Sequence, residues 1–145
     1  MMIRGFSMKK YVFCFSLSFF VFSCTKTSPE KTAQVSFENL KDGDVVKQTF
    51  PVKFSVKGMT VLPAGKDVND KTSGHHHILI DNPKGYIPAG EIVPADDKNI
   101  HYGKGQTKGE ITLSPGKHKL SLQFADGAHK SYGKALSRSI HVTVK

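Results

Sequence analysis

Beyond residue 34 the chain alternates apolar and polar residues with a period of two, and this pattern limits the fold more than any other feature. Val52, Phe54 and Val56 alternate with polar neighbours, and residues 35–37, 120–124 and 140–144 repeat the pattern. A period of two places alternate side chains on the same face of a β-strand. No stretch shows the 3.6-residue period of an amphipathic helix over a useful length. The pattern therefore predicts strands that each have one buried face.

Turn signals separate these stretches. Asp42-Gly43-Asp44, Ser114-Pro115-Gly116 and Asp126-Gly127 each supply a glycine or a proline suited to a tight turn. Further strands are expected at residues 75–81 and 111–113. About seven short strands in roughly 110 residues are typical of an immunoglobulin-like antiparallel β-sandwich. We predict a single all-β domain of this type over residues 34–145.

The first 23 residues have the layout of a lipoprotein signal peptide. Arg4, Lys9 and Lys10 precede an apolar run at residues 11–22, as in secretory signal peptides. This run is shorter than the ~20 residues that a membrane-spanning helix needs. Val21-Phe22-Ser23-Cys24 resembles a lipobox, so Cys24 is the predicted lipidation site, with ordinary secretory cleavage as the alternative.

Residues 24–33 are polar and predict a flexible tether between this lipid and the domain. The protein is therefore expected to be exported and lipid-anchored in the bacterial cell envelope, facing the periplasm or in the outer membrane. Its expected partner is the membrane, through the lipid on Cys24. Cys14 would be removed with the signal peptide, so no disulfide is expected within the domain.

The net charge is positive, with 21 Lys and Arg against 12 Asp and Glu and a formal charge of +9. The lysines are spread singly between residues 41 and 145 and form no basic stripe. Nucleic acid is therefore not an expected partner, and no protein partner is indicated. A solvated basic surface, attracted to anionic polymers of the envelope, is the simplest interpretation.

Histidines are the residues whose chemistry most needs an explanation, because the chain has seven and three are consecutive. In a strand, His76 shares the core face with Ile78, while His75 and His77 lie on the opposite face. Two imidazoles at i and i+2 can reach one metal ion. Neutral imidazole suits copper and zinc, which are the expected metals.

Topology would gather further ligands at the same end. If residues 75–81 pair with 117–125, His129 lies at the His75 end, together with the loop that carries Met59. A hairpin at Ser114-Pro115-Gly116 would also bring the loop of residues 101–106 there. The predicted metal site consists of His75, His77, His101, His129 and, as a soft ligand that would favour Cu(I), Met59.

Two other histidines are predicted to lie outside this site. His118 falls at the opposite end of its strand, where its inward direction indicates a structural role, and His141 points outward as a surface residue. Within the site, the proximity of three or more imidazoles raises the cost of protonating them, which should hold their pKa values below ~6.5. Metal affinity should then weaken as the pH falls through that region.

Two long segments, at residues 58–74 and 82–109, interrupt the strand pattern, and loops of this length are usually functional or disordered. We expect the second to be ordered over the sheet, because it contains several apolar residues. In the alternative interpretation the histidines, Tyr102 and Gln106 hydrogen-bond loop backbones in a non-catalytic binding or structural module. A third hypothesis is a metal-dependent redox enzyme. The chain has no GxSxG elbow or phosphate-loop spacing, which favours a non-catalytic protein.

Several ordered motifs resemble one bacterial family. They are Gly74-His75-His76-His77-Ile78-Leu79-Ile80-Asp81, His101-Tyr102-Gly103-Lys104-Gly105-Gln106-Thr107, Pro115-Gly116-Lys117-His118-Lys119-Leu120 and Asp126-Gly127-Ala128-His129. From about Val52 onward the chain resembles the family named domain of unknown function 4399. The resemblance implies an exported or lipid-anchored protein of unassigned activity. It also marks His76, Tyr102, Gly103, Lys104, Gly105, Gln106 and His118 as positions to test.

Overall fold

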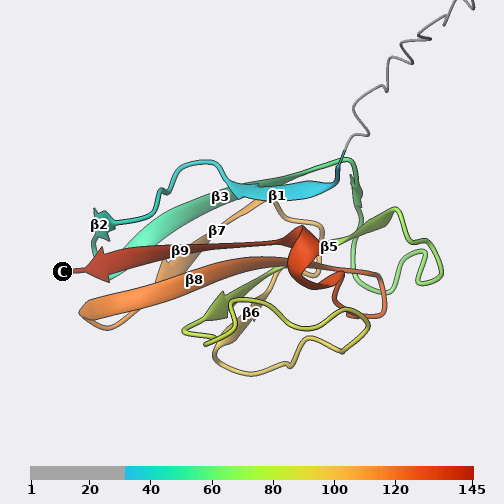
Figure 1. Cartoon of the computed structure of the whole chain (residues 1–145). Helices are drawn as coiled ribbons and strands as arrows, with labels where there is room; N and C mark the ends of the chain where they lie inside the picture. The colour runs from blue at the N-terminus through green and yellow to red at the C-terminus, as the bar shows by residue number, and fades with distance from the viewer. Residues whose placement is uncertain (1–31) are drawn as a thin grey trace, which may run out of the picture. The chain divides into compact units, whose positions relative to one another are not determined.

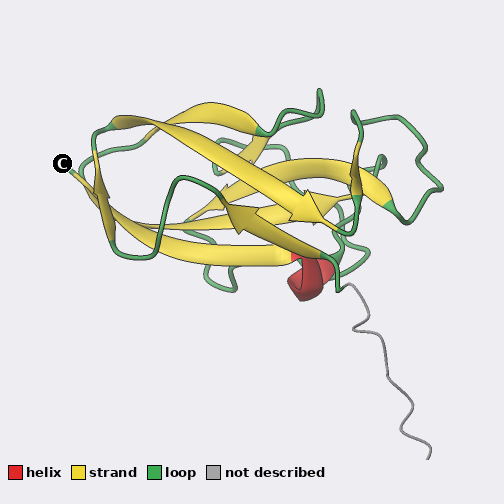
Figure 2. Cartoon of the chain, turned by 90° about the horizontal axis from the view of Figure 1, so that it is seen from above, coloured by secondary structure: helices red, strands yellow, loops and turns green. Residues whose placement is uncertain are grey.

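The alternating stretches form strands in the computed structural model, which describes residues 32–145. The longer strands are β1 (Gln34–Phe37), β3 (Thr49–Lys57), β5 (Ser73–Ile80), β7 (Lys108–Thr112), β8 (Gly116–Ala125) and β9 (Ser137–Val144). The shorter ones are β2 (Asp44–Val46), β4 (Thr60–Val61) and β6 (Asn99–His101). One 3-10 helix, η1 (Gly133–Leu136), precedes β9 and lies beside the strands (Figure 2).

The strands form two sheets. One sheet has the order β1-β3-β7, and the other has the order β2-β9-β8-β5-β4. In this second sheet β6 also pairs with β5. In Figure 1, β1 and β3 lie above β8 and β9. The prediction of an immunoglobulin-like β-sandwich is thus confirmed.

The main core lies between the two sheets and contains the residues that the alternation assigned to inner faces. Phe54, Val52 and Ile111 come from one sheet, and Leu122 and Phe124 come from the other. All five are at most 2% exposed. Burying a large apolar side chain contributes about 1.5–3 kcal/mol, so this layer holds the sheets together.

A second, smaller apolar layer covers the outer face of β5 and β8. Residues 82–98, which we call the cover segment, contribute Val93 and Ile87, which pack with Leu79 and Ala125. Gln123 fastens this layer: its Oε1 accepts a hydrogen bond from the Ile87 N–H, and its Nε2 donates to the backbone carbonyls of Phe124, Gly133 and Leu136. The expectation that residues 82–109 are ordered over the sheet is confirmed for the cover segment, whereas residues 99–101 form β6 and Ile100 packs against the main core.

Three expectations about the strands need correction. The described residues contain nine strands rather than about seven, because the three short ones carry too few residues to show alternation. Two of the short strands pair in parallel, β2 with β9 and β4 with β5. The turn at Ser114-Pro115-Gly116 does not form a hairpin, because β7 pairs with β3 and the chain crosses to the other sheet before β8.

The predictions for the signal peptide, for Cys24 and for nearly all of the tether lie outside the described residues. Within residues 32–145, no helix is long and apolar enough to span a membrane.

The bonds of Gln123 lead to a stability prediction. We expect Gln123→Met to lower the free energy of unfolding by about 2–4 kcal/mol, because it removes four hydrogen bonds and leaves the Ile87 N–H unpaired beneath the cover segment. Urea denaturation monitored by circular dichroism measures this loss. Gln48→Met is the matched control, since Gln48 is exposed, and it should change stability by less than about 0.5 kcal/mol. Equal effects of the two substitutions would contradict the role assigned to Gln123.

Candidate metal centre

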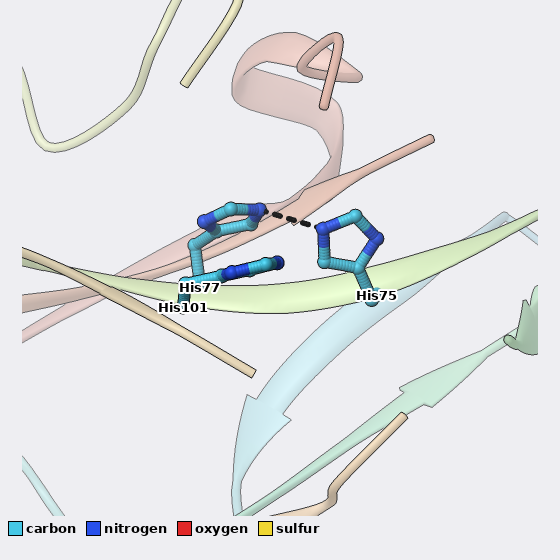
Figure 3. A group of neighbouring side chains, drawn as sticks. All are labelled: His75, His77 and His101. Atoms are coloured by element: carbon cyan, nitrogen blue, oxygen red, sulfur yellow. Dashed lines mark hydrogen bonds between the residues drawn. The ribbon is translucent and has the colours of Figure 1, made fainter. Parts of the chain in front are cut away.

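Strand β5 presents two histidines on its outer face. His75 and His77 alternate with His76, which faces the main core. The Nε2 atoms of His75 and His77 lie 3.0 Å apart, and Figure 3 shows the two rings side by side above β5. Both residues are at most 2% exposed, because the sheet lies on one side and the loops and the cover segment lie on the other. Period-two alternation thus creates a buried imidazole pair outside the main core.

His101 reaches this pair by strand pairing. In the antiparallel register of β6 with β5, His101 lies opposite His77, and their rings stack with centroids 4.9 Å apart. Figure 3 shows His101 beside His77. His101 itself is exposed, so it forms part of the solvent-facing rim of the cluster.

His129 arrives from the turn that follows β8, and the carboxylate of Asp126 organises this turn. Asp126 accepts hydrogen bonds from the backbone N–H groups of Ala128 and Lys130 and from Lys71 Nζ. The backbone of His129 has a φ of 64°, in the left-handed region that non-glycine residues adopt mainly in turns. Its carbonyl accepts from the Val93 N–H, so the cover segment also holds this residue in place.

The four imidazoles form one compact cluster. The ring centroids of His75, His101 and His129 lie 4.8–5.0 Å from one another. The Nε2 atoms of His129 and His101 are 3.2 Å apart. His75, His77 and His101 each offer a ligand nitrogen, and these three atoms lie within 4.8 Å of one another. The cluster therefore has a buried floor of two histidines and a rim of two more accessible ones.

Burial keeps the inner histidines neutral. It lowers the pKa of His75 to about 4, with further lowering by the charges of neighbouring imidazoles and a small opposing effect of Asp126. Burial also lowers the pKa of His77 to about 2, followed by the effects of His75 and His101. The pKa of His101 is lowered by burial and then by His129. The expected lowering is found, but desolvation is the first cause and mutual repulsion the second.

Two buried nitrogen atoms of the cluster have no hydrogen-bond partner among the described residues. They are Nδ1 of His75 and Nδ1 of His77. A buried polar atom without a partner costs about 1–3 kcal/mol. The imidazoles form hydrogen bonds with one another, at His75–His77 and at His101–His129, and not with loop backbones. Such an arrangement is unfavourable for packing alone.

Two nitrogen–nitrogen distances in the cluster are close to those of a tetrahedral ion, whereas the group of ligand atoms that lie within 4.8 Å of one another contains His75, His77 and His101 and not His129. Zn–N bonds of about 2.0–2.1 Å place ligand nitrogens about 3.3 Å apart in a tetrahedron, close to the 3.0 and 3.2 Å of the two Nε2 pairs. Neutral imidazole is a favourable ligand for Zn²⁺ and Cu²⁺. One feature departs from common metal sites, in which the second ring nitrogen of each histidine donates to an acceptor. Here Nδ1 of His75 and His77 lacks that acceptor, so packing orients these two rings.

Met59 and His76 lie apart from the cluster. Met59 is in the loop at the expected end of the sheet, just before β4, but it packs against the main core. His76 lies between the rings of Phe54 and Phe124, at centroid distances of 4.7 and 4.9 Å. Burial lowers the pKa of His76 to about 4, so it is a neutral member of the apolar layer.

The segment after His101 connects the cluster to neighbouring loops. Tyr102 points into the main core against Phe54, and burial raises the pKa of its phenol to about 12. The Gln106 Oε1 accepts from the Lys104 N–H. The Gly103 carbonyl accepts from the Ala64 N–H, and Gly105 has a φ of 76°. The Tyr102 hydroxyl has no hydrogen-bond partner among the described residues. Of Tyr102 and Gln106, only Gln106 therefore forms the bond to a loop backbone that the alternative interpretation required.

His118 and His141 each form a hydrogen bond with a nearby aspartate. His118 lies at the far end of the sheet, with Nδ1 2.9 Å from Asp81 Oδ2 and Nε2 3.0 Å from the Ser114 carbonyl oxygen. The bond to Asp81 raises the pKa of His118. His141 is exposed and lies 3.0 Å from Asp42. Both residues are therefore placed where the sequence analysis expected them.

Sequence reasoning missed two residues that build the centre. Asp126 was interpreted only as part of a turn signal and of a family motif, and Gln123 only as part of an alternating stretch. Asp126 directly precedes a glycine in a turn that leads to His129. This pattern is only a weak signal for a carboxylate that organises the turn. A lone glutamine among alternating leucines gives a stronger signal, because a buried amide needs several partners.

No curated protein matches the chain by sequence. The chain is similar to an endo-β-1,4-mannanase from Thermotoga petrophila, with 14% identity and a TM-score of 0.49 over 83% of this chain and 21% of that chain. It thus spans about a fifth of the mannanase chain. It is also similar to fibronectin(III)-like modules of Clostridium thermocellum CbhA, with 15% identity and a TM-score of 0.43 over 77% of this chain and 96% of that chain.

A family model covers most of the described chain. The model described as Domain of unknown function (DUF4399) matches residues 52–145. This range includes all four clustered histidines and begins where the motif resemblance began, so the resemblance is confirmed. The chain belongs to the DUF4399 family.

Proposed function

We propose that this protein is an envelope lipoprotein whose β-sandwich binds one transition-metal ion through His75, His77, His101 and His129. The observation that carries the proposal is the convergence of four imidazoles on one another, two of them buried. Neutral histidines that leave nitrogens unpaired destabilise the free protein. An ion held by the Nε2 atoms would leave Nδ1 of His75 and His77 unpaired, but its coordination bonds would replace the contacts between imidazoles and supply free energy that offsets the cost.

The ligand set narrows the choice of metal. Every proposed ligand is a neutral nitrogen donor, and Met59 is left out because it packs against the main core. Without a thioether or thiolate, the preference for soft Cu(I) is lost, and Zn²⁺ or Cu²⁺ fits best. The exposed position of His101 leaves an entry path for the ion.

The proposed location rests on the N-terminal sequence. Residues 1–23 have the charge and apolar pattern of a signal peptide, and Cys24 follows a lipobox-like sequence. We propose that the lipid on Cys24 anchors the protein in the cell envelope. A metal-binding domain on a tether would then meet ions outside the cytoplasm.

The main competing function is a binding or structural module in which the histidines only order loops. The contacts of the cluster favour metal binding over this alternative. The backbones of the neighbouring loops bond to one another, at Ala64–Gly103 and at Gly65–Gly127, and the four histidine rings take no part in these bonds.

The metal proposal is tested with the full-length, untagged protein and two histidine variants. We expect about one Zn²⁺ or Cu²⁺ per chain by elemental analysis after dialysis. His75→Ala/His77→Ala should lower the affinity in competition titrations by at least about 100-fold, because it removes both floor ligands. His141→Ala is the matched control and should leave affinity unchanged. Wild-type protein that is folded but holds no ion above background would refute the proposal.

The metal-free protein is expected to lose stability in acid. The pKa values of His75 and His77 are about 4 and about 2 in the folded protein, against ~6.5 in the unfolded chain. Below pH 6.5 the unfolded chain therefore binds protons that the folded protein does not, so stability present above pH 6.5 is lost as the pH falls toward 4.

Loss of metal affinity should also begin at a lower pH than the sequence analysis expected, because burial keeps these ligands neutral.

Urea denaturation of the metal-free protein at pH 7.5, 6, 5 and 4 measures the loss of stability. We expect the free energy of unfolding to fall by a few kcal/mol between pH 6.5 and 4. A His75→Leu/His77→Leu variant should show a shallower fall. Stability that is constant across this range would show that the buried histidines are not held neutral by the fold.

A further inference from the structure

Gly103 lacks a side chain at the place where the His101 imidazole lies. A Cβ atom built on Gly103 would overlap the Cε1 and Nε2 atoms of His101 and would approach its Nδ1 to 3.1 Å. Cε1 is the nearest of these atoms and Nε2 is almost as close, and this Nε2 pairs with Nε2 of His129. The position of this ring in the cluster therefore requires the absence of a Cβ two residues later.

The backbone at this position does not itself require glycine. Gly105 has a φ of 76°, in the left-handed region that favours glycine, whereas Gly103 is not among the glycines with positive φ. The hydrogen bond that Gly103 makes, from the Ala64 N–H to its carbonyl, involves only main-chain atoms. Any residue could form that bond. The space occupied by His101 is thus the specific reason for glycine at position 103.

Few other contacts hold the His101 ring in place. It stacks on His77 with an interplanar angle of 19°, and its Nε2 pairs with His129. His101 is exposed, so solvent offers it other side-chain rotamers. A small steric change at position 103 would therefore displace the ring readily.

We propose that Gly103 is a positioning residue of the histidine centre, which keeps Nε2 of His101 directed toward the other imidazoles. The proposal deepens the metal function proposed above and rests on it for its effect on metal affinity. The steric relation between position 103 and the His101 ring exists without metal, so it can be tested in the metal-free protein. Alanine at position 103 turns His101 away and leaves the other three imidazoles in place.

The first test measures metal affinity in the full-length protein. Gly103→Ala should weaken Zn²⁺ binding about 10- to 100-fold, as expected for a residue that orients a ligand. It should also change the ligand-field spectrum of the Co²⁺-substituted protein, since one nitrogen ligand is lost. The control is Lys104→Ala, at an exposed neighbouring position, which should retain wild-type affinity and spectrum. Wild-type affinity in Gly103→Ala would overturn the proposal.

The second test uses the metal-free protein and separates this proposal from the metal function. In ¹⁵N spectra of the imidazoles, Gly103→Ala should shift the ring resonances of His101 and His129 and leave those of His118 unchanged. Unfolding midpoints of the double-mutant cycle with His101→Ala give a second readout. Gly103→Ala should lower the midpoint in the presence of His101 and should lower it much less when His101 is alanine.

The cycle remains informative if Gly103→Ala fails to fold. Restored folding in Gly103→Ala/His101→Ala supports the steric relation between the two residues. An equal loss of stability in both backgrounds overturns it, because the cost would then arise from the backbone. If the ring shifts and the cycle agree with the proposal but no ion binds to the wild type, the metal function fails and the positioning role of Gly103 stands.

Discussion

The attachment of the cover segment to the outer face of β5 and β8 is the interaction on which the candidate centre depends. An outer face of a β-sandwich is ordinarily solvated and carries polar side chains. Here Gln123 bonds the cover segment at Ile87, and Val93 donates to the His129 carbonyl. These contacts bury Leu79 and Ala125 in a small apolar layer. They also place His129 beside histidines that would otherwise face water.

This burial explains the electrostatics of the centre. Desolvation keeps His75 and His77 neutral, and neutral imidazoles can approach one another without charge repulsion. The same burial leaves two ring nitrogens without partners. Under the proposed function, the free energy of metal binding offsets the cost of this cluster, which lies at the meeting point of β5, β6 and the turn after β8. Asp126 shapes the rim by holding the turn that carries His129. Gly103 shapes it by leaving space for the His101 ring.

The sequence predicted some of this arrangement well and some of it poorly. Alternation correctly assigned His76 to the core and His75 with His77 to the opposite face, because side-chain direction in a strand follows from parity alone. His101 was placed at the correct end for a wrong reason: pairing of β6 with β5 brings it there, not a hairpin at Ser114-Pro115-Gly116. A three-residue strand gives no periodic signal, and its partner is chosen by tertiary contacts. Nothing in the sequence indicated that Met59 packs against the main core, because Met59 lies in a loop and the two-residue strand β4 that follows it shows no periodic pattern.

The most direct test of the account is X-ray absorption spectroscopy of the full-length protein loaded with one equivalent of Zn²⁺ or Cu²⁺. We expect a first shell dominated by nitrogen, at about 2.0–2.1 Å for zinc, together with the outer-shell scattering that imidazole rings produce. This result would establish histidine ligation by the centre itself. A shell of about six oxygens without imidazole scattering, as for hydrated ions bound at surface carboxylates, would contradict the central claim.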